Sequence, residues 1–246
     1  MRVSNLTTVF GRLLATFATF AMLATAVSAT TARAAEKPMK IGIIGTGKIG
    51  GALAEHWAKA GHDLLISSRH PEELKPLAAK LGSHVKVGTP AEAAAYGDVI
   101  LISVPYKALP QVGQDFAKQL AGKVVLETGN PYPQRDGEMA VKAREQGTGA
   151  ASKSFLPGVK LVRAFNAINA GNLRDDANRS GSLVAIPLAG DDKDALAVAS
   201  QLVRDAGFDP VIVGDLSQAR RFDVNTKVYV QVLSAKELRK ELQLKE

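Results

Sequence analysis

Three glycines near the start of the main apolar part of the chain have the spacing G-x-G-x-x-G, which is typical of sites that bind the pyrophosphate of a dinucleotide. The six residues are Gly45, Thr46, Gly47, Lys48, Ile49 and Gly50. In such a site the first glycine permits a tight turn, the second lets the backbone approach the pyrophosphate, and the third lets a helix pack closely on a strand. We predict a dinucleotide site here; the alternative is that the glycines serve only a turn.

The residues after the next apolar stretch predict which nucleotide binds. An NAD-selective site has an aspartate or glutamate at this point, where its carboxylate bonds the ribose 2′-hydroxyl. This chain has Ser67, Ser68, Arg69 and His70 instead. Hydroxyl and guanidinium groups donate hydrogen bonds to phosphate oxygens, and arginine can donate two in parallel. The pattern predicts NADP(H); the alternative is that Arg69 is a solvated loop residue.

No set of residues predicts acid–base, nucleophilic or metal chemistry. Cysteine is absent, the four histidines are scattered, and the sequence lacks the G-x-S-x-G motif of serine hydrolases. Hydride transfer between NADPH and a flavin-like ring needs no catalytic side chain, because the cofactors carry the chemistry and the protein orients them. We therefore predict an NADP-dependent oxidoreductase with no catalytic residue and no metal ligand.

Eight apolar runs alternate with helix-like stretches and predict the elements that position these residues. The runs span 40–45, 63–67, 84–88, 98–104, 123–128, 160–165, 183–190 and 209–214. Several are continuously apolar, as in strands covered on both faces. Between the first two, apolar residues recur at helical spacing up to Gly61. We predict an α/β fold: a single Rossmann-type, doubly wound, mostly parallel sheet over 35–246, ending in a surface turn and a short C-terminal helical segment.

Residues 1–34 have the layout of a secretory signal peptide. A basic start with Arg2 and Arg12 leads into an uncharged run, and the run ends in the small-x-small sequence Ala32-Arg33-Ala34. We predict cleavage after Ala34 and export to the periplasm. No twin-arginine pair precedes the run, so we expect the chain to cross the membrane unfolded and without bound NADPH. The alternative is an uncleaved membrane anchor, because the uncharged stretch is long enough to span a bilayer.

The composition argues against a nucleic-acid partner. The net charge of +7 falls to +4 without the leader, and no basic cluster is interleaved with aromatic residues. We expect a small-molecule electron acceptor as the partner, and no stable membrane span after processing. A homodimer is compatible with the sequence.

The chain resembles a known family over about Lys40 to Phe222. The resemblance rests on "IGIIGTGKIGGALA", "ISSRHPE", "DVILISVPYKAL", "VVLETGNPY", "LVRAFNAINAGNL" and "LAGDDKDALAVASQLVRDAGFDPVIVGDL". These segments together are similar to the NADPH-dependent reductases of the 8-hydroxy-5-deazaflavin coenzyme. The cytosolic domain of the six-transmembrane metalloreductases belongs to the same broad group.

This resemblance implies NADPH as cofactor and a flavin or deazaflavin as co-substrate. It places 46–49 on the pyrophosphate and Ser68 with Arg69 on the 2′-phosphate. It also implies two walls around the nicotinamide and the hydride acceptor, formed by Val104, Pro105, Tyr106, Asn166, Ala167 and Ile168, with Asn130 as a polar group on the acceptor side. For both asparagines, capping of a loop is the alternative.

Two other functions stay open at this point. The chain could be a non-catalytic NADP-binding module, such as a sensor or a subunit of an electron-transfer partner. It could also be an imine reductase, since pyrroline-5-carboxylate reductases share a similar N-terminal domain. The glycine loop and Arg69 support a reductase and a binding module equally.

Overall fold

The computed structural model describes residues 37–245. The predicted signal peptide lies outside the described residues. The eight strands are β1 (Lys40–Ile44), β2 (Asp63–Ser67), β3 (Val85–Gly88), β4 (Val99–Ile102), β5 (Val124–Glu127), β6 (Lys160–Arg163), β7 (Ala185–Gly190) and β8 (Asp209–Gly214). Each lies within a predicted apolar run and ends within two residues of its limits.

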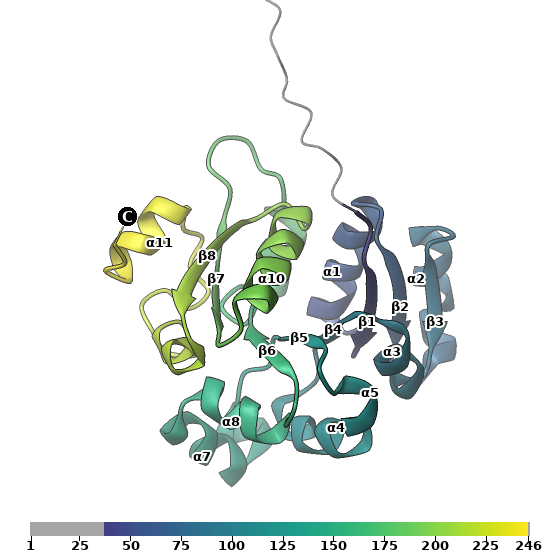
Figure 1. Cartoon of the computed structure of the whole chain (residues 1–246). Coiled ribbons are helices and arrows are strands. Elements are labelled where there is room, and N and C mark those ends of the chain that lie inside the picture. Colours follow the sequence, from purple (N-terminus) through teal and green to yellow (C-terminus); the bar gives the residue numbers. More distant parts are fainter. Residues whose placement is uncertain (1–36, 246) are drawn as a thin grey trace, which may run out of the picture. The chain divides into compact units, whose positions relative to one another are not determined.

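The strands form one twisted sheet in the order β3-β2-β1-β4-β5-β6-β7-β8 (Figure 1). All neighbours are parallel except β6 and β7, where Val162 lies opposite Gly190 in an antiparallel pair. The prediction of a mostly parallel, doubly wound sheet is confirmed. The continuous apolar runs are explained by their burial: β4 and β7 are buried along their whole length.

Helices cover both faces of the sheet. The longer ones are α1 (Lys48–Lys59), α2 (Lys75–Leu81), α3 (Pro90–Tyr96), α4 (Leu109–Asp115), α7 (Glu138–Gln146), α8 (Thr148–Phe155), α9 (Ala170–Asp175) and α10 (Lys193–Asp205). Shorter helical turns are η1 (Pro71–Leu74), η2 (Tyr106–Ala108), α5 (Ala117–Leu120) and α6 (Pro133–Asp136).

One core, under α1 and α10, contains Trp57, whose indole Nε1 donates to the Leu202 carbonyl at 2.8 Å. A second core lies under α3, α4 and α8.

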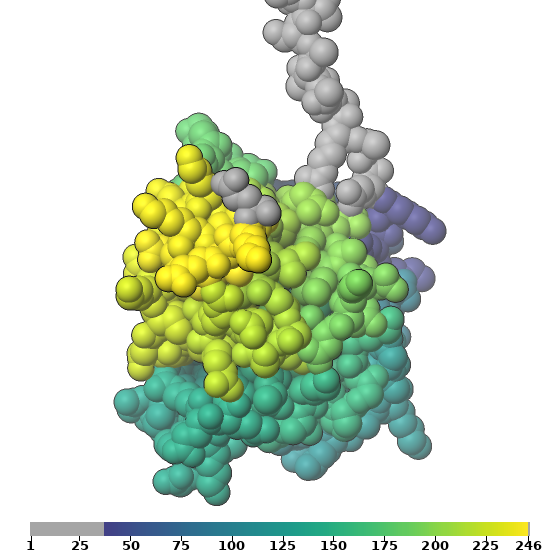
Figure 2. Space-filling model, turned by 60° about the vertical axis from the view of Figure 1, so that its left-hand side comes forward, coloured from purple at the N-terminus to yellow at the C-terminus, as the bar shows by residue number. Residues whose placement is uncertain are grey.

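The C-terminal part packs more closely than the predicted surface turn. After η3 (Leu216–Arg221) the chain forms a loop over 222–234, here called the C-terminal loop, and ends in α11 (Ala235–Glu241). Phe222 and Leu238 are buried with residues of β7 and β8 in a third core. In the space-filling view this part lies directly against the preceding strands and helices (Figure 2). The segment before α11 is therefore longer and more closely packed than the predicted turn, because its apolar side chains cover the sheet. The predicted C-terminal helix is confirmed as α11.

The topology marks where a ligand would bind. The strands that follow β1 are first added on one side of it, as β2 and β3, and then on the other side, starting with β4. In open α/β sheets, ligands bind beyond the carboxyl ends of the strands at such a switch point. The glycine loop follows β1, and Ser103 follows β4. Within residues 37–245, no helix combines the length and the apolar character needed to cross a bilayer.

Candidate dinucleotide and acceptor site

The glycine loop after β1 has the geometry that its spacing predicts. Gly45 has a φ of +96°, and a Cβ there would lie 2.4 Å from the Ser103 carbonyl oxygen. A Cβ on Gly50 would lie 2.2 Å from the Gly45 carbonyl oxygen, so only glycine lets α1 approach this closely. The turn and the helix contact both depend on the absence of side chains.

Gly47 differs from its two neighbours because it faces open space. A Cβ on this residue would have no atom within 4 Å, although Gly47 is the N-cap of the twelve-residue helix α1. No side chain caps this helix end, so its first N–H groups and the positive end of its dipole are free to meet an anion. The site therefore fits a pyrophosphate that approaches the backbone at Gly47, while Lys48 is exposed and Ile49 half-buried beside it.

Ser67 holds the glycine loop instead of contacting a nucleotide. Its hydroxyl is fully buried and donates to the Ile43 carbonyl at 2.7 Å. Its own carbonyl accepts from the N–H groups of Gly45 and Thr46 and from the Thr46 hydroxyl, at 3.0–3.2 Å. The prediction of Ser67 as a side-chain contact is wrong, because the end of β2 is used to fix the loop.

The other three residues at the end of β2 lie at the surface. Ser68 is half-buried and its hydroxyl accepts from the His70 N–H at 3.0 Å, whereas Arg69 and His70 are exposed. Within residues 37–245, Arg69 has no carboxylate partner, so its guanidinium is available to a phosphate. The His70 Nδ1 atom lies 3.7 Å from the Glu72 carboxylate.

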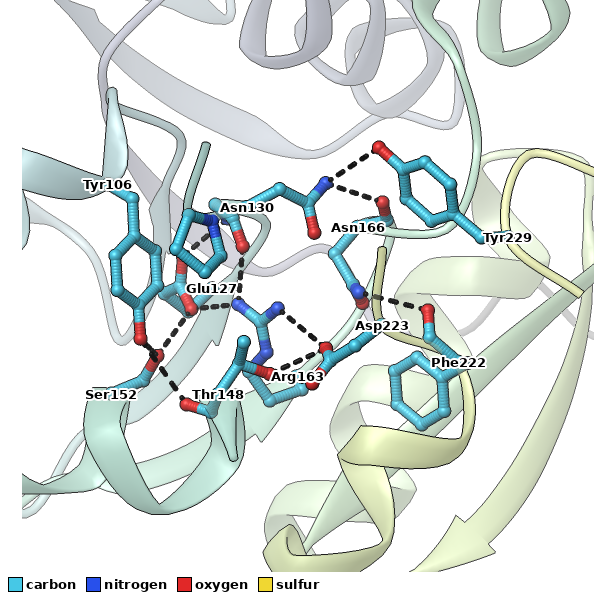
Figure 3. Close-up of polar contacts among 12 residues, drawn as sticks. Tyr106, Glu127, Asn130, Thr148, Ser152, Arg163, Asn166, Phe222, Asp223 and Tyr229 are labelled. Atoms are coloured by element: carbon cyan, nitrogen blue, oxygen red, sulfur yellow. Dashed lines mark hydrogen bonds and ion pairs between the residues drawn. The ribbon is translucent and has the colours of Figure 1, made fainter. Parts of the chain in front are cut away.

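The segment after β4 has only part of the predicted wall at the surface. Pro105 is exposed and Val104 half-buried, and Val104 packs against the Gly45 turn. Tyr106 is fully buried, and its hydroxyl bonds the Ser152 hydroxyl at 3.0 Å (Figure 3). The prediction that Tyr106 lines the nicotinamide is wrong for its side chain, because the ring packs into the core against Phe155.

Asn130 connects the end of β5 with the end of β6 and the C-terminal loop. Its Nδ2 donates to the Asn166 carbonyl at 2.8 Å and to the Tyr229 hydroxyl at 3.4 Å (Figure 3). The Val230 N–H donates to the Ala167 carbonyl at 2.8 Å. The structure thus brings together the two predicted asparagines and adds Tyr229, which lies beyond the resemblance.

The segment 166–168 is buried. Its residues Asn166, Ala167 and Ile168 are each at most 7% exposed. Asn166 directs its Nδ2 to the Phe222 carbonyl at 3.4 Å, so its side chain supports the C-terminal loop. A contact between this segment and the nicotinamide stays a prediction. The Asn130 Oδ1 is buried and, among the described residues, has no hydrogen-bond donor. Such an oxygen can accept from the carboxamide of a nicotinamide.

A buried charge network that the sequence analysis missed lies under Asn130 (Figure 3). Arg163 forms an ion pair with Glu127 and lies 3.5 Å from the Asp223 carboxylate. Glu127 accepts from the Gly129 N–H, and Arg163 donates to the Gly129 carbonyl at 2.8 Å. The peptide groups that lead into Asn130 are therefore held on both sides by charged side chains.

The surroundings of Arg163 favour its charged form. Burial opposes the charged guanidinium, but the carboxylates of Glu127 and Asp223 raise the pKa of Arg163 overall. Burial, followed by the Glu127 charge, raises the pKa of Tyr106. The sequence held a signal for the pair, because Glu127 and Arg163 each follow two buried apolar residues at the end of a strand. The two residues lie opposite each other in the register of β5 and β6.

The fold and the loop define the class of protein, a Rossmann-type α/β protein with a dinucleotide-binding loop. Comparison with known proteins gives the family. Residues 40–131 match the family described as "NADP oxidoreductase coenzyme F420-dependent". The F420-dependent NADP reductase of Methanothermobacter marburgensis is 30% identical over 208 residues, covering 79% of this chain and 92% of that protein. The chain therefore belongs to this family and is an NADP-dependent oxidoreductase.

Two further similarities extend the comparison. The metalloreductase STEAP3 of Rattus norvegicus is 29% identical over 198 residues, which cover 78% of this chain but only 37% of that protein. The crystal structure of a hypothetical protein from Sinorhizobium meliloti aligns with a TM-score of 0.67 and 25% identity, over 80% of this chain and 96% of that one. The expected resemblance to both reductase groups is confirmed.

Proposed function

We propose that this protein transfers hydride from NADPH to a flavin or deazaflavin-type acceptor. The observation that supports the acceptor most directly is the meeting of Asn130, the segment 166–168 and Tyr229 beyond the carboxyl ends of β5 and β6. This position follows the glycine loop along the same edge of the sheet. A dinucleotide bound at the loop and extended along that edge would bring its nicotinamide to these residues.

In this proposal, the residues of this chain bind NADPH and orient its nicotinamide. Gly47 and the start of α1 hold the pyrophosphate, and Arg69 with Ser68 holds the 2′-phosphate. Asn130 accepts from the carboxamide through its free Oδ1, while its Nδ2 fixes it to the Asn166 carbonyl. Bound NADPH supplies the hydride, and no side chain of the protein has to exchange a proton.

The proposal is tested by the acceptor itself. Protein purified after expression of the whole chain is mixed anaerobically with NADPH or NADH, and FMN, riboflavin, 5-deazariboflavin, a ferric chelate or a cyclic imine is offered in turn. We expect NADPH to be consumed with a flavin or deazaflavin, and NADH at least about tenfold more slowly. Nucleotide binding without oxidation by any acceptor would favour a non-catalytic module. Activity confined to a cyclic imine would favour an imine reductase.

We also propose that the protein is exported and loses residues 1–34. The support is the agreement of the basic start, the uncharged run and the Ala32-Arg33-Ala34 ending in the sequence. Cells are fractionated, and the N-terminus of the protein is read by mass spectrometry. We expect Ala35 at the N-terminus in the periplasmic fraction; an intact Met1 in the cytosol would contradict export, and an intact Met1 in the membrane fraction would indicate an anchor.

A further inference from the structure

Two tyrosines lie together at the acceptor side of the site. The hydroxyl groups of Tyr132, which precedes α6, and Tyr229, in the C-terminal loop, form a hydrogen bond with each other. Both side chains are half-buried. The Asn130 Nδ2, which holds the Asn166 carbonyl, also donates to the Tyr229 hydroxyl at 3.4 Å (Figure 3). Asn130 thus links the pair to the segment that the proposed function places beside the nicotinamide.

The tyrosine pair has one hydrogen-bond donor left over. Two phenols carry two hydrogens, and one of them is used between the two oxygens. The Asn130 amide adds a donor, not an acceptor. Within residues 37–245, neither hydroxyl has another hydrogen-bond partner, so whichever way the bond between them runs, one O–H remains for a molecule outside the chain.

The surroundings favour an electron-rich partner for this O–H. The Arg135 guanidinium lies 5.1 Å from the centroid of the Tyr132 ring, and its Nη2 donates to the Asn130 carbonyl at 2.7 Å. Burial and the bond to Tyr132 raise the pKa of Tyr229, which therefore keeps its proton at neutral pH. Arg135 is itself paired with the Asp136 carboxylate at 2.7 Å, so the phenolic O–H is the group that can donate to a carbonyl oxygen gaining negative charge.

We propose that Tyr132 and Tyr229 recognise the hydride acceptor by donating one phenolic O–H to a carbonyl oxygen on a heteroaromatic ring, as in a flavin or deazaflavin. This inference rests on the proposed function for the position of the nicotinamide. It adds to the proposed function the class of acceptor: the site selects a planar molecule with a ring carbonyl, not a hydrated metal ion. Either tyrosine can supply the donor when the other is missing.

The test uses Tyr132→Phe, Tyr229→Phe and the double variant, which keep the aromatic rings. Tyr96→Phe, a partly exposed tyrosine near Lys86, is the matched control. Riboflavin binding is titrated in the presence of NADP+, and the KM for riboflavin and the Kd for NADPH are measured. Because each single variant keeps one free O–H, we expect less than about a threefold loss of riboflavin affinity, against about tenfold in the double variant. The Kd for NADPH should not change.

The outcomes separate this inference from the proposed function. Equal riboflavin affinity in the double variant and the wild type would overturn the inference, even if the wild type is active. Failure of the wild type to bind riboflavin at all would overturn it too. Riboflavin binding that depends on the tyrosines, without NADPH oxidation, would support the inference and overturn the proposed function. A tenfold loss of riboflavin affinity in either single variant would contradict the claim that either tyrosine can supply the donor.

Discussion

Arg69 is the residue on which the choice of nucleotide depends. It is exposed, it follows β2 where an NAD-selective site has a carboxylate, and within residues 37–245 no carboxylate neutralises it. Loss of a hydrogen bond to a charged phosphate costs about 1.5–3 kcal/mol. We expect Arg69→Ala to weaken NADPH binding by about 10- to 150-fold and to leave NADH binding nearly unchanged. Fluorescence titration of both nucleotides checks this, and equal NADPH affinity in the two proteins would contradict the assignment.

A substitution at Gly47 is expected to abolish nucleotide binding without preventing folding. A Cβ there meets no atom of the protein, so Gly47→Val should fold, at a cost of about 1 kcal/mol for a poorer N-cap. The added side chain fills the space through which the pyrophosphate approaches, and we expect no measurable NADPH binding. Isothermal titration and thermal unfolding measure the two effects.

Gly50→Val provides the contrast to this variant. Its Cβ would lie 2.2 Å from the Gly45 carbonyl oxygen, so we expect loss of the fold and not only of binding. A Gly47→Val protein that folds and still binds NADPH with wild-type affinity would be incompatible with a pyrophosphate at the glycine loop.

At the scale of elements, the buried pair between β5 and β6 links the sheet to the C-terminal loop. Removal of one partner of a buried ion pair costs about 3–5 kcal/mol, because the other charge stays buried. Arg163→Met leaves both Glu127 and Asp223 without their cation, whereas Glu127→Gln leaves Arg163 beside Asp223. We therefore expect Arg163→Met to be the more destabilising.

Denaturant unfolding of the single variants and of the double variant Glu127→Gln/Arg163→Met checks this prediction. The double variant should be more stable than the sum of the two single effects implies, since it removes both charges of the closest pair. Strictly additive losses would show that Glu127 and Arg163 contribute independently.

The strands could be predicted from sequence because their signal is local. Each strand of the parallel sheet is an apolar run between turn residues, and the glycine loop is six consecutive residues, so both can be read without knowing the fold. The burial of Ser67 and Tyr106 could not be read in this way. A serine or tyrosine at the end of a strand looks the same whether it faces a ligand or the core, and the packing of α8 decides for Tyr106.

At the scale of the whole molecule, the site depends on contacts between distant parts of the sequence. Asn130 and Tyr229 are 99 residues apart, and Arg163 joins Glu127 to Asp223 across three elements. A pattern in one segment cannot predict such contacts, which is why the role of the C-terminal loop emerged only from the structure. In the proposed function, the loop completes the acceptor side of the site, and the first half of the sheet forms its cofactor side.

The transfer of a label from NADPH to the acceptor tests the central proposal most directly. NADPH deuterated at both C4 positions is mixed anaerobically with the protein and 5-deazariboflavin, and the reduced acceptor is analysed by mass spectrometry. Hydride transfer within one site predicts a single deuterium bound to carbon in the product, at a rate that falls when NADH replaces NADPH. A reduced product without deuterium, or no reduced product with protein that binds NADPH, would contradict the proposed reductase.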